Sequence, residues 1–196
     1  MVLIPIKDFR RAKNRLAERL DAAERVALAQ RMASAVIRAA HPNDVRVVCS
    51  DREVASWAEA NGAGVLWVDV EGLNPAVEAA VAQLAQQTEH VLIAHADLPQ
   101  ARTLAGLATR GAVSIVPDRH HEGTNVLALP TGMDFRFKYG QGSLHAHVAE
   151  ALARGLDVHL LQRPELQVDV DTPEDLDAAV SAGSRNDPPE PGEPAP

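Results

Sequence analysis

The chain has 196 residues, enough for one domain with a sizeable hydrophobic core. Its 19 Lys and Arg residues against 27 Asp and Glu residues give a formal net charge of −8, and a chain without surplus positive charge is a poor partner for nucleic acid. Aromatic residues make up only 3% of the chain, so Ala, Val and Leu must build the core, which favours helices packed on a sheet over a β-sandwich.

The sequence carries no signal for a membrane or for export. No apolar segment approaches membrane-spanning length, and the N-terminus lacks the pattern of a signal peptide. The single cysteine, Cys49, lies in an apolar run and cannot form an internal disulfide, so we expect it to be buried. These features predict a soluble, cytoplasmic protein without membrane contact.

Short apolar runs alternate with amphipathic segments through the first 118 residues. We expect strands at residues 2–6, 45–50, 64–70, 90–96 and 112–118. We expect helices between them, at residues 12–40, 52–61, 75–87 and 101–110. This alternation predicts a mostly parallel sheet with helices on both faces, a single-domain, three-layer α/β fold.

The pattern changes after residue 118. Residues 124–130 and 135–140 look like strands, residues 143–155 like a helix, and residues 166–180 like a strand that leads into a final helix. Thr172 is the expected N-cap of that helix, with Pro173 at its first position. Residues 184–196 are rich in proline without large apolar side chains, which predicts a disordered tail behind a domain of residues 1–183.

Three aspartates are expected at one edge of the sheet. Asp97 follows the strand at 90–96, and Asp169 and Asp171 have the i, i+2 spacing that points both side chains to one face of a strand. Ligands of open parallel sheets bind outside the carboxyl ends of the strands. Taken singly, Asp97 is better explained as a strand end and Asp171 as support for a helix start. Three together favour a bound cation, and Mg²⁺ suits them because it takes carboxylate oxygens and leaves positions for phosphates.

A basic run, "IPIKDFRRAKNRL", follows the first strand. Its five cations are Lys7, Arg10, Arg11, Lys13 and Arg15. A solvated helix face is the ordinary explanation of such a run, but this one lies at the first βα turn, where nucleotide-binding sheets place phosphates. Neither a Walker A sequence nor G-x-G-x-x-G is present, so phosphate would be held by Lys and Arg charge.

Two glycine-containing turns could hold an anion. Gly123 and Thr124 offer a backbone amide and a hydroxyl, and Gly140, Gly142 and Ser143 precede a helix whose N-terminal amides can bind an anion. Ordinary turn and capping chemistry explains both turns equally well. The nearby histidines lack a cysteine partner and the spacing of zinc ligands, and no G-x-S-x-G elbow is present.

Taken in chain order, these motifs resemble those of a known family. They are "IPIKDFRRAKNRL", "GLN" at 72–74, "HADLP", "PDRHHEGTNVLAL", "YGQGS" followed by His147, and "DVDTPEDL". They resemble the CofC/FbiD family, guanylyltransferases of coenzyme F-420 biosynthesis, from the first strand to about residue 182. The resemblance implies the nucleotidyltransferase fold of sugar-nucleotide enzymes. It also implies transfer of GMP from GTP to the phosphate of phosphoenolpyruvate, 2-phospho-L-lactate or 3-phospho-D-glycerate, with release of pyrophosphate.

The resemblance also implies roles for single residues. The positions that match the magnesium-binding acids are Asp97, Asp169 and Asp171. The positions that match the pocket for the phosphorylated acid are Thr124, Gly140 and Ser143. Lys7 and Lys13 match the basic motif beside the nucleotide phosphates and, with Asp97, are the expected catalytic residues. The guanine base would be read by Gly72, Leu73 and Asn74, where the Asn74 amide offers a donor and an acceptor.

Two departures from the family leave alternatives open. His95 stands where the family commonly has an acidic residue, so the site could have one metal ligand fewer. His120 and His121 stand where smaller residues are usual, and near the pocket they could change which phospho-acid is accepted. The alternatives are another transferase of this fold, such as a molybdopterin guanylyltransferase or a glycosyltransferase, and a nucleotide sensor without turnover. The N-terminal glycine-rich signature of the molybdopterin enzymes is absent. The family's pathway implies transient contact with a downstream transferase, and the number of subunits stays open, a homodimer included.

Overall fold

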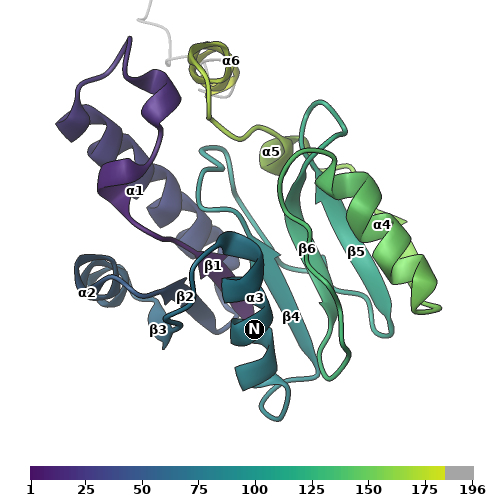
Figure 1. Ribbon diagram of the computed structural model, residues 1–196. Coiled ribbons are helices and arrows are strands. Elements are labelled where there is room, and N and C mark those ends of the chain that lie inside the picture. Colours follow the sequence, from purple (N-terminus) through teal and green to yellow (C-terminus); the bar gives the residue numbers. More distant parts are fainter. Residues whose placement is uncertain (184–196) are drawn as a thin grey trace, which may run out of the picture.

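A seven-stranded sheet forms the middle layer of the protein (Figure 1), whose computed structural model describes residues 1–183; the expected tail at 184–196 lies outside the described residues. The strands are β1 (Val2–Pro5), β2 (Val45–Cys49), β3 (Gly64–Trp67), β4 (His90–Ala94), β5 (Ala112–Pro117), β6 (Thr124–Pro130) and β7 (Asp157–Leu160). They lie in the order β3-β2-β1-β4-β6-β5-β7. Only β6 runs against its neighbours, β4 and β5, so the predicted mostly parallel sheet is confirmed.

Helices cover both faces of the sheet (Figure 1). Helices α1 (Ala22–Ala40), α2 (Arg52–Ala60) and α5 (Pro164–Gln167) share a buried cluster on one face, and α3 (Leu73–Leu84) and α4 (Ser143–Ala153) share a cluster on the other. Strand β4 contributes to both, because Leu92 packs toward α1 whereas Val91 and Ile93 pack toward α3. The three-layer arrangement predicted from the sequence is therefore confirmed.

The first helical region begins later than expected. Two 3₁₀ turns, η1 (Phe9–Arg11) and η2 (Asn14–Leu16), precede α1. Helix α1 starts after Asp21 because Asp21 and Glu24 form a reciprocal capping box, each carboxylate accepting the other residue's backbone N–H at 2.8 Å. None of the helices in residues 1–183 combines the length and the apolar character needed to cross a membrane.

Two expected elements are absent from their predicted places. Residues 101–110 form an irregular segment and no helix; Leu104 and Leu107 are buried beneath α1, and the Leu104 N–H donates to the Ala39 carbonyl at 2.7 Å. Tertiary contact thus overrides the local helical preference.

Residues 135–140 are extended, but they do not join the sheet. Their backbone amides donate to side chains instead: Arg136 to Glu150, Lys138 to His147 and Tyr139 to Asn74. Alternate side chains, Phe135, Phe137 and Tyr139, are buried against the α3 and α4 face. The strand expected at residues 135–140 is therefore wrong, because side chains of α3 and α4 accept these hydrogen bonds in place of a neighbouring strand.

The C-terminal part also differs from expectation. The edge strand β7 was not foreseen, and the strand expected at the start of residues 166–180 is replaced by α5 and an extended segment outside the sheet. Pro164 starts α5, a position that suits proline because its missing N–H would have no helical partner. The final helix, α6 (Pro173–Gly183), has Thr172 as the predicted N-cap, since the Asp175 N–H donates to Thr172 Oγ1 at 3.3 Å.

We predict that Ile93→Ala lowers the free energy of unfolding by about 2–5 kcal/mol, because Ile93 is fully buried in the central strand and its removal leaves a cavity. Urea denaturation measures the change. The control is Leu152→Ala on the outer face of α4, where the side chain is 61% exposed and the effect should stay under about 0.5 kcal/mol. Equal effects of the two variants would contradict the assigned core.

Candidate active site

A cavity of about 790 Å³ opens at the edge of the sheet where β1, β4 and β5 end. Because β6 runs antiparallel, its first residue, Thr124, reaches the same edge. Most of the residues predicted to act in a site line this cavity: Lys7, Lys13, Leu73, Asp97, Thr124, Gly140, Ser143, Asp169 and Asp171. The structure thus brings together residues that are up to 164 positions apart, from Lys7 to Asp171 (171 − 7).

Lys13 joins two of the three predicted metal-binding acids. Its Nζ donates to Asp97 Oδ2 at 2.5 Å and to Asp171 Oδ1 at 2.8 Å. Burial by itself lowers the pKa of the Lys13 ammonium, but attraction to both carboxylates outweighs burial and the pKa is raised above its usual value. For Asp97 burial acts in the opposite direction and raises the pKa. The positive charge of Lys13, followed by a smaller effect of His95, outweighs burial, so the Asp97 pKa is lowered.

Asp169, the third acid, is held by a residue that the sequence analysis missed. Asn125 is buried, and its Nδ2 donates to the Leu166 carbonyl at 3.0 Å and to Asp169 Oδ1 at 3.4 Å. Burial and repulsion by Asp97 raise the pKa of Asp169. A polar residue next to Thr124 at the start of a buried strand was the available sequence signal.

Asp171 is held through its backbone by a second unforeseen residue. Asp175 Oδ2 accepts the N–H groups of Asp171 at 3.1 Å and Thr172 at 2.8 Å, and Asp175 Oδ1 accepts from Arg119 at 2.5 Å. Asp169 and Asp171 both line the cavity, while Val170 between them packs against Leu16 and Met32. The i, i+2 argument for the two acids was therefore correct, although their segment lies outside the sheet.

The predicted cation position is occupied by an ammonium group. Across residues 1–183, no cluster of three or more His, Cys, Asp or Glu side chains is arranged to hold a metal ion, and Lys13 lies between Asp97 and Asp171. The donor set nevertheless fits a hard cation, because it consists of carboxylate oxygens and Asp97 Oδ1 is buried without a hydrogen-bond partner among the described residues. Magnesium binding stays a prediction.

The glycine-containing turns also line the cavity. Thr124 and Ser143 are both buried there, and Ser143 begins α4. Two of the first amides of α4 already have partners, since Ser143 donates to the Gly140 carbonyl and Leu144 to the Glu122 carbonyl. These two amides are therefore not free to bind an anion as we expected of the start of this helix.

The neighbouring loop depends on Gly123. A Cβ at this position would lie 2.7 Å from Asp118 Oδ2, and Asp118 Oδ1 accepts the amides of His120 and Glu122. His120 and His121 are exposed and do not line the cavity. Their positions therefore give no support to the expectation that they affect which phospho-acid is accepted.

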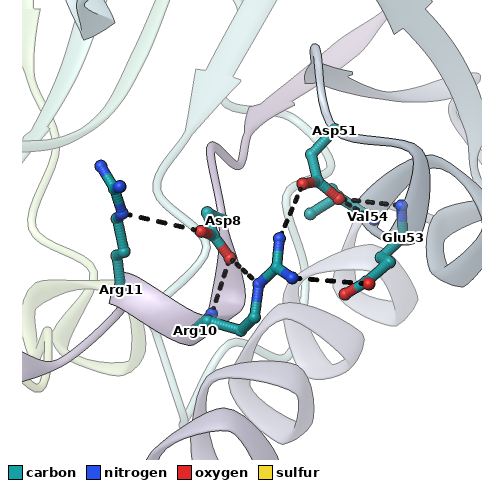
Figure 2. A network of polar contacts seen from close by, with 6 residues as sticks. All are labelled: Asp8, Arg10, Arg11, Asp51, Glu53 and Val54. Atoms are coloured by element: carbon teal, nitrogen blue, oxygen red, sulfur yellow. Dashed lines mark hydrogen bonds and ion pairs between the residues drawn. The ribbon is translucent and has the colours of Figure 1, made fainter.

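One cation of the basic run faces away from the cavity. Arg10 bonds to Asp8 Oδ1 at 3.2 Å and to Asp51 Oδ2 at 3.3 Å, and it pairs with Glu53 at 3.5 Å. Figure 2 marks these three contacts with dashed lines. Asp51 also caps α2 by accepting the amides of Glu53 and Val54. Arg10 thus fastens the loop to α2, while Lys7, Arg11, Lys13 and Arg15 line the cavity.

A second cavity of about 570 Å³ adjoins the first and shares Lys7, Arg11 and Leu73 with it. Gly72 lines this second cavity, whereas Asn74 lines neither. Asn74 Nδ2 donates to the Tyr139 carbonyl at 3.2 Å, and Asn74 Oδ1 accepts the Tyr139 N–H at 2.7 Å. Both polar groups on which its predicted guanine contact rested are therefore bonded to the protein backbone.

Comparison with known proteins decides the family. Residues 1–188 match the family model of CofC-like guanylyl transferases. The chain belongs to this family. It is 35% identical to a phosphoenolpyruvate guanylyltransferase of Roseiflexus castenholzii over 89% of this chain and 84% of the relative. It is 34% identical to a 2-phospho-L-lactate guanylyltransferase of Methanothermobacter thermautotrophicus over 92% of this chain and 84% of the relative.

Solved structures agree with this membership at the level of the fold. A protein of Desulfovibrio desulfuricans G20 assigned to the nucleotide-diphospho-sugar transferases covers 94% of this chain and 87% of its own, with a TM-score of 0.71 and 14% identity. A nucleotidyl transferase of Methanothermobacter covers 95% of this chain and 98% of its own, with a TM-score of 0.64 and 18% identity. The CofC-family chain is thus a nucleotidyltransferase with the fold predicted from its motifs.

We predict that Lys13→Met lowers the free energy of unfolding by about 3 kcal/mol at pH 7 in metal-free buffer, because it leaves the partly buried Asp97 carboxylate without its counter-charge. Asp97 has a lowered pKa, so its stabilising effect is present above the unfolded value of about 3.9 and is lost as the pH falls through the folded value. In the variant, burial without Lys13 favours protonated Asp97, so the difference between variant and wild type should shrink as the pH falls toward and below about 3.9.

The control for this variant is Lys7→Met. The Lys7 side chain is 69% exposed and pairs with exposed Glu71 only at 3.9 Å, so its loss should change stability little at any pH. A Lys13→Met variant that matches wild type at pH 7 would contradict the ion-pair assignment.

Proposed function

We propose that this protein transfers GMP from GTP to the phosphate of a small three-carbon phospho-acid and releases pyrophosphate, as a step of coenzyme F-420 biosynthesis. One observation carries the proposal: a single cavity joins Lys13 and three carboxylates to the hydroxyls of Thr124 and Ser143. The names of its relatives supply candidate acids, phosphoenolpyruvate and 2-phospho-L-lactate, and 3-phospho-D-glycerate is a third.

The reaction asks mainly for positioning and charge. An oxygen of the acceptor phosphate attacks the α-phosphorus of GTP, and the bond from that phosphorus to the bridging oxygen of pyrophosphate breaks. The acceptor oxygen is already ionised at neutral pH, so no general base is needed. Two anions must meet, and Lys7, Arg11 and Lys13 line the cavity where their charges would favour the approach and the departing pyrophosphate.

The two cavities suggest how the substrates divide the site. The phospho-acid would bind at Thr124, Gly140 and Ser143 in the larger cavity. The nucleoside would occupy the adjoining cavity beside Gly72, with Lys7 and Leu73 at the shared boundary. This arrangement supports an in-line approach because the α-phosphate would lie between the two binding regions.

Magnesium completes the proposal. Asp97, Asp169 and Asp171 would hold it, since they supply the carboxylate oxygens that this ion prefers. When bound, it would offset the negative charge of the phosphate groups. Asn125 and Asp175 would keep Asp169 and Asp171 in place through the contacts described above.

Pyrophosphate release tests the reaction. We expect GTP and Mg²⁺ to yield pyrophosphate with one of the three acids, and to yield none when ATP or CTP replaces GTP. A folded protein that binds GTP but releases no pyrophosphate with any of the three acids would overturn the proposal and favour a nucleotide sensor.

We predict that Asp97→Asn lowers kcat by about 100-fold or more in the same assay, because it removes a charge that faces the reacting groups. Asp134→Asn is the matched control: Asp134 is 91% exposed, lies outside both cavities and should leave kcat unchanged. Equal kcat values for the two variants would remove Asp97 from the active site.

A further inference from the structure

His147 is fully buried in α4, and both nitrogens of its ring have partners. Nε2 lies 3.0 Å from the backbone nitrogen of Lys138, and Nδ1 lies 3.0 Å from Thr124 Oγ1. A backbone N–H can only donate, so His147 Nε2 must be the acceptor and carries no proton.

The protonation state of the other nitrogen follows. Burial, with a smaller effect from His95, lowers the pKa of His147 to about 4, so the ring is neutral at pH 7. A neutral imidazole carries one proton, and with Nε2 acting as acceptor that proton is on Nδ1. His147 Nδ1–H therefore donates to Thr124 Oγ1.

The direction of this bond fixes what Thr124 can do. Its oxygen accepts from His147, so the hydroxyl hydrogen has to point to another acceptor. Within residues 1–183, His147 is the partner found for Thr124 Oγ1, and Thr124 lines the large cavity. In the same part of the chain no acceptor is found for the hydroxyl hydrogen, and a molecule bound in that cavity can supply one; an anionic oxygen is the acceptor that such a donor binds best.

We propose that His147 is a positioning residue that holds the Thr124 hydroxyl as a hydrogen-bond donor toward the phospho-acid. The inference rests on the proposed function, because it takes the phospho-acid to be the molecule that Thr124 meets. His147 does not line the cavity and acts only through Thr124.

The surroundings of the ring keep it in one orientation. Tyr139 lies edge-on to it with ring centroids 4.8 Å apart, and Phe135 and Phe137 lie at 6.1 and 6.5 Å. These side chains belong to the segment of residues 135–140, which His147 also contacts by accepting the Lys138 N–H. Its two contacts therefore have separate consequences, one for the segment and one for Thr124.

Two substitutions separate these contacts. The amide of Asn places a donor near the position of Nδ1, so His147→Asn keeps the bond to Thr124 and loses the acceptor for Lys138. The longer Gln places its amide near the position of Nε2, so His147→Gln keeps the acceptor for Lys138 and loses the donor to Thr124. Both variants lose one contact of the same ring, which makes each a control for the other.

We expect His147→Gln to raise the KM for the phospho-acid by roughly 10- to 100-fold, the effect of disturbing one hydrogen bond to a charged group, and to leave the KM for GTP unchanged. His147→Asn should keep the acid KM close to wild type. In a Thr124→Val background, which lacks the hydroxyl, His147→Gln should add nothing. If His147→Gln has the wild-type acid KM, or if both variants raise it equally, the inference is wrong.

Nitrogen-15 NMR of the histidine rings tests the same inference without turnover or substitution. A proton on Nδ1 of His147 is expected, and a proton on Nε2 would overturn the assignment.

Calorimetric titration of wild type and both variants with phosphoenolpyruvate, 2-phospho-L-lactate and 3-phospho-D-glycerate separates this inference from the proposed reaction. Acid binding with the expected variant pattern but no pyrophosphate release would overturn the reaction and leave the role of His147 standing. Normal turnover with no difference between the variants would leave the reaction standing and overturn the role of His147. A wild type that binds none of the acids would overturn both.

Discussion

The ion pair of Lys13 with Asp97 and Asp171 holds three distant parts of the chain at one point. It joins the loop after β1, the end of β4 and the segment before α6. Lys13 has a left-handed backbone with φ of 56°, a conformation that costs about 1–2 kcal/mol for a residue with a side chain. Lys13 contacts Asp97 and Asp171 and not Asp169, whose pKa is raised by burial and by repulsion from Asp97, so a cation bound beside Asp169 would stabilise its ionised form.

The reversed direction of β6 builds the other wall of the site. It brings Thr124 and Asn125 to the edge where the parallel strands end. Residues 135–140 then cross the α3 and α4 face without a strand partner, and the side chains of Asn74, His147 and Glu150 satisfy their amides. Side-chain hydrogen bonds therefore take over the role of a sheet ladder here, and one of those side chains also contacts the cavity wall at Thr124.

Several polar residues whose side chains could bind a ligand are bonded to other parts of the protein, where they stabilise the structure around the site. Arg10 carries a charge suited to phosphate, but three acids of the loop and α2 surround it (Figure 2). Asn74 has the donor and acceptor needed to read a base, but both bond to Tyr139. The Asp175 carboxylate accepts hydrogen bonds from two backbone amides and from Arg119. A buried polar group left unpaired is costly, so such partners stabilise the positions of the residues that do line the cavity.

The sequence by itself determined what depends on near neighbours along the chain. The alternating elements, the Thr172 cap and the common face of Asp169 and Asp171 follow from periodicity and capping, which adjacent residues encode. Only the tertiary structure decided the direction of β6, the irregular path of residues 101–110, the bridge made by Lys13 and the partners of Asn74. Each of these rests on contacts between residues far apart in the chain, such as the 84 positions that separate Lys13 from Asp97, and local patterns carry no record of such distant partners.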